Sequence, residues 1–135
     1  MKKDVKKKKF INHPIEDVWE ALSSEEKLSE WFMQANFKPE EGFKFEFTEP
    51  SGKKLTGEIL TAQDPINLAY SWNDSNLNYT TYVWWKLATK NNGTLLELEH
   101  SGFKGLKDYF GGFRYASKWN KQIKKLKKYL SKASG

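Results

Sequence analysis

The chain has 135 residues, a net charge of +6 at pH 7 and no cysteine. This length suits a single domain, expected over residues 1–135, and can bury a core without disulfides or metal ions. The lack of cysteine excludes a thiol nucleophile, a disulfide framework and a thiolate metal site. No apolar stretch is long enough to span a bilayer or resembles a signal peptide, so we expect a cytoplasmic protein with no transmembrane association.

The positive charge comes from lysine, because Arg114 is the single arginine among the 23 basic residues. The lysines are concentrated in residues 2–9 and 118–132. Proteins that read nucleic-acid sequence rely on arginine for bidentate contacts, so we expect no specific nucleic-acid partner. A solvated surface is the simplest interpretation of these lysines. Nonspecific attraction to nucleic acid or to an anionic membrane surface is the alternative.

The first part of the chain predicts a strand followed by a short helix. Alternation over residues 5–12 puts Val5 and Ile11 on one face of the strand. Pro14 suits the first turn of a helix, because its fixed φ and missing N–H cost nothing there. Four apolar residues then follow with the spacing of one helix face, namely Ile15, Val18, Trp19 and Leu22.

A second short helix is predicted directly after the first. Ser23 and Glu26 have the spacing of a capping box, and Trp31 and Phe32 are among the apolar residues of this helix. Alternating apolar residues then predict five strands, over residues 43–47, 55–62, 68–72, 79–89 and 94–101.

Three residues add detail to these strands. Gly57 predicts a bend or a bulge in the second of the five. Asn92 and Gly93 form a hairpin turn signal between the last two. Trp84 falls on the mostly polar face of its strand, where an exposed indole is unusual.

A long helix is predicted from about Tyr109 or Phe113 to Leu130. Its apolar stripe has spacings of three or four and consists of Tyr115, Trp119, Ile123, Leu126 and Leu130. The order strand, two helices, five strands and long helix predicts an α+β fold. We expect a curved antiparallel six-stranded sheet with the long helix across its concave face, which is the helix-grip fold.

The residues also resemble a known family, the SRPBCC (START-like) superfamily. Within it, the chain is similar to the branch related to the C-terminal domain of the activator of heat-shock protein 90 ATPase. The matching segments are Pro14, Val18–Trp19, Ala21–Leu22, Trp31–Phe32, Gly57–Leu60, Leu68–Trp72, Leu96–Phe103, Trp119 and Leu126–Leu130. The resemblance implies a cavity between the long helix and the sheet, and such sites are mainly apolar with a few polar groups.

Large inward-facing side chains are the candidates for lining this cavity. They are Trp31, Phe32, Phe45, Phe47, Tyr70, Trp72, Val83, Trp85, Leu98, His100, Phe103, Phe113 and Trp119. For any one of these residues, ordinary core packing is the simpler explanation, because large rings are commonly buried. Many rigid rings together favour an incompletely filled interior.

His100 is the one titratable group expected on the inner face of the late strands. It could bind the polar end of a ligand or act as an acid or base. The simpler interpretation is a buried histidine that hydrogen-bonds to the backbone or to Tyr70. The two histidines have no ligand spacing, so we expect no metal, and we expect no other cofactor.

We therefore expect non-enzymatic binding of a hydrophobic or amphipathic small molecule, lipid-like or aromatic, with His100 and Tyr70 orienting its polar end. One alternative is a co-chaperone-like module that binds a protein partner, a heat-shock ATPase. Another is a cavity enzyme such as a cyclase or hydrolase, although no triad or phosphate-binding loop is present in the sequence. The expected state is a monomer or a homodimer.

Overall fold

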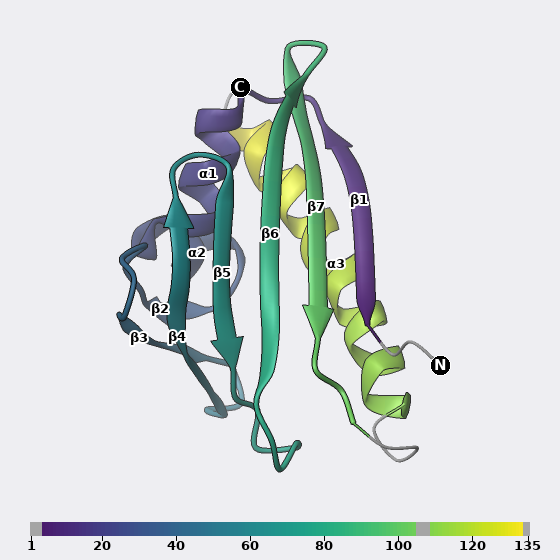
Figure 1. Ribbon diagram of the computed structural model, residues 1–135. Helices are drawn as coiled ribbons and strands as arrows, with labels where there is room; N and C mark the ends of the chain where they lie inside the picture. The colour runs from purple at the N-terminus through teal and green to yellow at the C-terminus, as the bar shows by residue number, and fades with distance from the viewer. Residues whose placement is uncertain (1–3, 105–108, 134–135) are drawn as a thin grey trace.

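The computed structural model describes residues 4–104 and 109–133 (Figure 1). One antiparallel sheet carries α3 diagonally across one of its faces (Figure 1). The strands are β1 (Val5–Ile11), β2 (Gln34–Asn36), β3 (Lys44–Thr48), β4 (Lys54–Gln63), β5 (Asn67–Trp72), β6 (Thr81–Lys90) and β7 (Gly93–Ser101). The helices are α1 (Ile15–Ser23), α2 (Glu25–Trp31) and α3 (Tyr109–Ala133). The predicted α+β class is confirmed, as are the two short helices after the first strand and the long C-terminal helix.

The described sheet has seven strands in the order β1-β7-β6-β5-β4-β3-β2, so the predicted count of six is wrong by one. The additional strand is β2, which pairs with β3 through Gln34, Ala35 and Asn36. Three residues are too few for alternation to be recognised in a sequence. The strand at the other edge of the sheet is β1, which pairs with β7 between Val5–Ile11 and Thr94–His100.

The β6–β7 hairpin is confirmed, but its turn lies one residue earlier than predicted. Lys90 pairs with Gly93, and the two residues between them, Asn91 and Asn92, have φ values of +50° and +65°. Positive φ at both central residues defines a two-residue hairpin turn that suits asparagine. Gly93 is instead needed inside the strand, because a Cβ there would lie 2.6 Å from the carbonyl oxygen of Ile11.

The two short helices are confirmed, and the residue that caps the second is corrected. The N-cap is Ser24, whose Oγ accepts from the backbone N–H of Lys27 at 3.4 Å. Ser23 is still the last residue of α1, and its hydroxyl donates to the carbonyl of Trp19 at 2.7 Å. The sequence does not distinguish Ser23 from Ser24 as the N-cap, because the two serines are adjacent and the cap depends on where the first helix ends.

The apolar stripe of α3 is buried against the sheet, as predicted. Tyr115, Trp119, Ile123, Leu126 and Leu130 are each at most 6% exposed. The last turns of α3 lie beside α1 and α2 (Figure 1). There the Tyr129 hydroxyl donates to Glu30 at 2.9 Å, and the Lys125 ammonium donates to the Phe32 carbonyl at 3.5 Å. These contacts fix the helix across the concave face.

The bulge in β4 lies after Gly57 rather than at it. The pairing register shifts between Ile59 and Thr61, whereas Gly57 pairs regularly with Phe45. Gly57 is needed for space, because an added Cβ would press on the Ser71 carbonyl oxygen and lie 2.5 Å from Cζ of Phe45. Glycine here leaves room for the edge of the Phe45 ring beside the strand.

We expect Gly57→Ala to lower the free energy of unfolding by about 1–3 kcal/mol, the range typical of overpacking. The measurement is urea denaturation followed by tryptophan fluorescence. Gly42→Ala is the comparison: φ there is +88° and no atom lies within 4 Å of the added Cβ, so backbone strain alone should cost about 1 kcal/mol. A Gly57→Ala protein as stable as the wild type would contradict the assignment.

Candidate functional site

The candidate cavity residues occupy two different environments. Twelve of the thirteen are at most 9% exposed, and eleven of these belong to one continuous hydrophobic core, the twelfth being the buried polar residue His100. Phe113 is 60% exposed and lies outside this core. The buried twelve are Trp31, Phe32, Phe45, Phe47, Tyr70, Trp72, Val83, Trp85, Leu98, His100, Phe103 and Trp119. Most of their rings contact one another, with centroid separations of 4.7–6.5 Å. Phe37, which the sequence analysis did not select, packs among them.

His100 is fully buried and both of its ring nitrogens are hydrogen-bonded. The indole N–H of Trp119 donates to Nδ1 at 3.0 Å. Nε2 therefore carries the ring hydrogen and donates to Oγ1 of Thr81 at 2.7 Å, and the Thr81 hydroxyl donates to the carbonyl of Trp72 at 3.3 Å. This network favours the interpretation of His100 as a buried histidine with internal partners.

The partners of His100 differ from the expected one, Tyr70. The Tyr70 hydroxyl instead accepts from the indole N–H of Trp85 at 2.9 Å. Burial lowers the pKa of His100 to about 3, although the negative charge of Asp74 acts in the opposite direction. The imidazole is therefore neutral near pH 7, which its two hydrogen bonds require.

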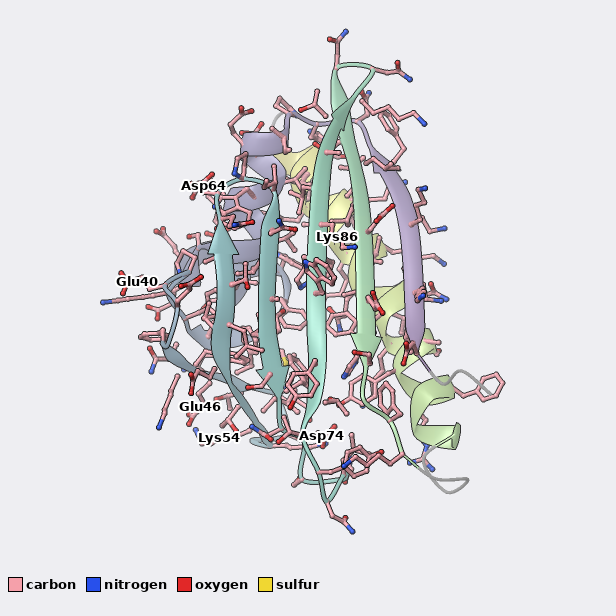
Figure 2. The ribbon with its side chains drawn as sticks, in the orientation of Figure 1. Glu40, Glu46, Lys54, Asp64, Asp74 and Lys86 are labelled. Carbon is pink, nitrogen blue, oxygen red and sulfur yellow. The ribbon has the colours of Figure 1, made fainter. Side chains whose placement is uncertain are left out.

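A second polar network joins α3 to the loops at one end of the sheet. The Trp72 indole donates to the Tyr115 hydroxyl at 2.9 Å, and that hydroxyl donates to Asp74. Asp74 is 4% exposed, and it pairs with the ammonium of Lys53 at 2.6 Å. Figure 2 places Asp74 at the end of β5 and β6, opposite the β6–β7 turn. The network thus connects α3, β5 and the β3–β4 turn.

The charge states of this network follow from its contacts. Burial by itself raises the pKa of Asp74, but hydrogen bonds from Lys53, Tyr115 and the backbone of Asn76 outweigh it, so the pKa lies below its ordinary value. Burial, followed by the hydrogen bond to Asp74, raises the pKa of the Tyr115 phenol. Asp74 is therefore a carboxylate and Tyr115 a neutral phenol near pH 7.

A groove of about 350 Å³, open to solvent, lies between α3 and the β3–β4 turn. Its apolar lining comes from Phe32, Met33, Pro50, Leu55, Trp72, Tyr115 and Trp119. Its polar lining comes from Glu49, Ser51, Lys118, Gln122 and Lys125. A second hollow of about 430 Å³ shares Phe32, Met33, Glu49 and Pro50 with the groove and extends it towards β2. Aromatic rings and charged side chains thus meet at one accessible surface.

The groove contains three of the thirteen candidate residues, Phe32, Trp72 and Trp119. His100 does not line it. The residues that the sequence analysis missed come mainly from the β3–β4 turn and from the polar positions of α3, such as Gln122. The available signal was the helical spacing of Lys118, Gln122 and Lys125 at i, i+4 and i+7, which puts them on one face of α3 beside the apolar stripe.

The opposite face of the sheet has a more polar hollow of about 300 Å³, lined by lysine and glutamate side chains of β1, β6 and β7 together with Trp84. Trp84 is 39% exposed, as expected for its face, and the ammonium of Lys86 lies 3.7 Å from its ring centroid. Figure 2 shows Lys86 pointing out from this face of β6. Because this hollow lacks a floor of several rings, it is a weaker candidate for binding an apolar group.

Within residues 4–104 and 109–133, no group of three histidine, aspartate or glutamate side chains is arranged to hold a metal ion. No helix in the same ranges combines the length and the apolar character needed to cross a bilayer.

Comparison with known proteins identifies the family. The model of the family described as Activator of Hsp90 ATPase homolog 1-like protein matches residues 12–131. The chain belongs to this family. The resemblance noted from the sequence is thereby confirmed, and the match includes the groove residues of α3 and of the β3–β4 turn. A search of curated protein sequences found no match.

Solved structures support the same fold. Protein MLL2253 from Mesorhizobium loti is 30% identical with a TM-score of 0.86, covering 96% of this chain and 97% of that one. Protein BH1534 from Bacillus halodurans is 28% identical with a TM-score of 0.79, covering 94% and 96%. The Aha1 dimer from Colwellia psychrerythraea is 16% identical with a TM-score of 0.80, covering 94% and 95%, and supports the fold alone.

We expect the free energy of unfolding to fall as the pH is lowered from about 6.5 towards 3. The unfolded chain protonates His100 near its ordinary pKa of 6.5, whereas the folded protein does so only near pH 3. Between these values the unfolded state binds more protons, so His100 alone destabilises the fold by about 1.4 kcal/mol for each pH unit.

Urea denaturation between pH 4.5 and 7 measures this effect. His100→Gln keeps one acceptor and one donor group for Trp119 and Thr81 but cannot titrate, so its stability should depend less steeply on pH. His13→Gln, which changes the other histidine outside the core, is the control. Equal pH dependence in the wild type and His100→Gln would contradict the assignment.

Proposed function

We propose that this protein binds an amphipathic small molecule in the groove between α3 and the β3–β4 turn. The observation that carries the proposal is the groove itself, where the rings of Phe32, Trp72 and Trp119 face an opening of about 350 Å³. Small-molecule sites typically have volumes of about 300–1,000 Å³, apolar walls and a few polar groups. The apolar part of a ligand would contact the rings, and its polar part would face the rim.

The proposed binding site does not include His100. Four rings surround that imidazole, with centroids 4.6–6.1 Å away, and its two nitrogens have internal partners. Trp72 and Trp119 both pack against His100 and both line the groove, whereas His100 does not line it. The histidine thus supports the floor of the groove rather than the ligand.

A binding role fits the groove better than catalysis does. The buried Tyr115 lines the groove, and its hydroxyl donates a hydrogen bond to the buried Asp74. The pKa of Asp74 is lowered and that of Tyr115 is raised, so neither group is ready to exchange a proton near pH 7. We therefore propose a non-enzymatic function.

The family match supports a second candidate, a co-chaperone-like contact with a heat-shock ATPase. The fold shared with an Aha1 dimer is compatible with it and with a homodimer. Measuring ATP turnover by Hsp90 with and without this protein tests the candidate, and sedimentation of the purified protein gives its oligomeric state. If ATP turnover by Hsp90 is unchanged and Hsp90 forms no complex with this protein, the co-chaperone candidate is wrong.

We expect Met33→Gln to weaken binding of the uncharged fluorescent amine N-phenyl-1-naphthylamine by about fivefold. Met33 is partly buried and lines both hollows of the groove, so an amide there replaces about 1 kcal/mol of apolar contact. Fluorescence titration gives the dissociation constant.

Ile66→Gln is the matched control, because Ile66 is 47% exposed and lies in the turn between β4 and β5. It should leave the dissociation constant unchanged. If the two variants lowered the affinity equally, the probe would not be bound in the groove. Lack of binding by the wild type, for this amine and for the charged probes described below, would refute a ligand-binding function.

A further inference from the structure

The rim of the groove carries three polar side chains from one face of α3. Lys118, Gln122 and Lys125 follow at i, i+4 and i+7, and all three line the groove. The ring of Trp119 lies beside them as part of the floor. A ligand with its apolar part on the rings therefore has its polar part next to this row.

Gln122 has an acceptor atom without a partner. Its side-chain Oε1 is shielded from solvent yet accepts no hydrogen bond, and no other buried side-chain nitrogen or oxygen in the described part of the chain lacks a partner. Leaving such an acceptor unpaired is unfavourable, so buried acceptors are nearly always satisfied. Gln122 lines the groove, so a turn of its side chain would bring this oxygen to a ligand N–H or O–H.

The two lysines give the rim a positive charge. The Lys118 ammonium lies 5.2 Å from the centroid of the Tyr115 ring, and the Lys125 ammonium donates to the Phe32 carbonyl at 3.5 Å. Among the described residues, neither lysine is paired with a carboxylate.

Glu49 is the acidic residue of the groove, and its carboxylate accepts from the Ser51 hydroxyl at 3.4 Å. The ammonium of Lys53 is paired with the buried carboxylate of Asp74 and does not add to the charge of the rim. Two ammonium groups thus face one carboxylate, and the balance at the rim favours an anion.

We propose that the ligand is an amphipathic anion with a hydrogen-bond donor close to its acidic group. The acidic group lies between Lys118 and Lys125, the donor binds Oε1 of Gln122, and the apolar part contacts the apolar lining around Phe32 and Met33. This inference rests on the proposed function and adds the chemical class of the ligand. An aromatic or aliphatic acid with a neighbouring hydroxyl or amino group fits it, whereas a cationic amphiphile does not.

Two related probes separate the charge from the apolar contact. 8-Anilinonaphthalene-1-sulfonate carries an anion and an N–H donor, and N-phenyl-1-naphthylamine is the same ring system without the sulfonate. In the Lys118→Gln/Lys125→Gln double variant, affinity for the sulfonate should fall about tenfold, since each exposed charge pair contributes up to about fivefold. Affinity for the uncharged amine should stay within about twofold.

The control is Lys124→Gln/Lys127→Gln, which removes the same total charge from exposed positions of α3 that do not line the groove. It should change sulfonate affinity by less than about twofold in 0.15 M salt, because distant surface charges are screened. Glu49→Gln should act in the opposite direction and strengthen sulfonate binding about twofold.

The outcomes distinguish the two proposals. If both probes bind and the Lys118→Gln/Lys125→Gln protein binds the sulfonate as the wild type does, the anion proposal is wrong and the binding function stands. An equal loss in both lysine double variants would show a general charge effect and would also refute the anion site. If neither probe binds the wild type, both proposals fail.

Gln122→Met tests the donor separately. The variant removes the unpaired acceptor, so the free protein should be at least as stable as the wild type. Its affinity for 8-anilinonaphthalene-1-sulfonate should fall about fivefold through loss of one hydrogen bond, whereas naphthalene-1-sulfonate, which has no donor, should bind unchanged. Calorimetric titration measures both probes. Equal losses for the two sulfonates, or none for either, would refute the role of Gln122.

Discussion

The structure depends on pairing the polar atoms of an aromatic core. Indole, phenol and imidazole rings fill the space between α3 and the sheet, and each brings at least one polar atom that is unfavourable to bury alone. Trp119 and Tyr115 of α3 meet His100 and Trp72 of the sheet through hydrogen bonds of 2.9–3.0 Å. Apolar packing alone would allow α3 to slide or rotate, but these directional bonds permit one position.

The same pairing explains why the interior is filled and the groove lies at its edge. Rings that must satisfy one another's donors pack at close range, which leaves no place for a ligand around His100. The pairing ends with Tyr115, Asp74 and Lys53, which connect α3 to the β3–β4 turn. Beyond this point Phe32, Trp72, Tyr115 and Trp119 form the inner wall of the groove, although each is at most 9% exposed. A buried network thus holds the rings that line the groove.

Much of the fold could be predicted because it depends on local periodicity. The stripe from Tyr115 to Leu130 indicated both the helix and its buried face, and alternation around Val83 and Trp85 gave the inner face of β6 correctly. The errors came from features that local patterns do not define. β2 has only three residues, and the residue that caps α2 depends on where α1 ends. Gly57 is required because the ring of Phe45 occupies the space of a Cβ, and not because of a bulge.

The sequence by itself determined the fold class, the family and the set of large buried rings, since these follow from spacing and residue type. Only the tertiary structure decided which of those rings line the groove. Phe113 and His100 were both reasonable candidates, yet one is on the surface and the other is enclosed. The groove unites Met33, the β3–β4 turn and the polar row of α3, and their proximity arises from packing between segments far apart in the chain. The hydrogen-bond partner of a buried polar atom is nonlocal for the same reason. Tertiary packing decides which donor or acceptor comes within about 3 Å of that atom.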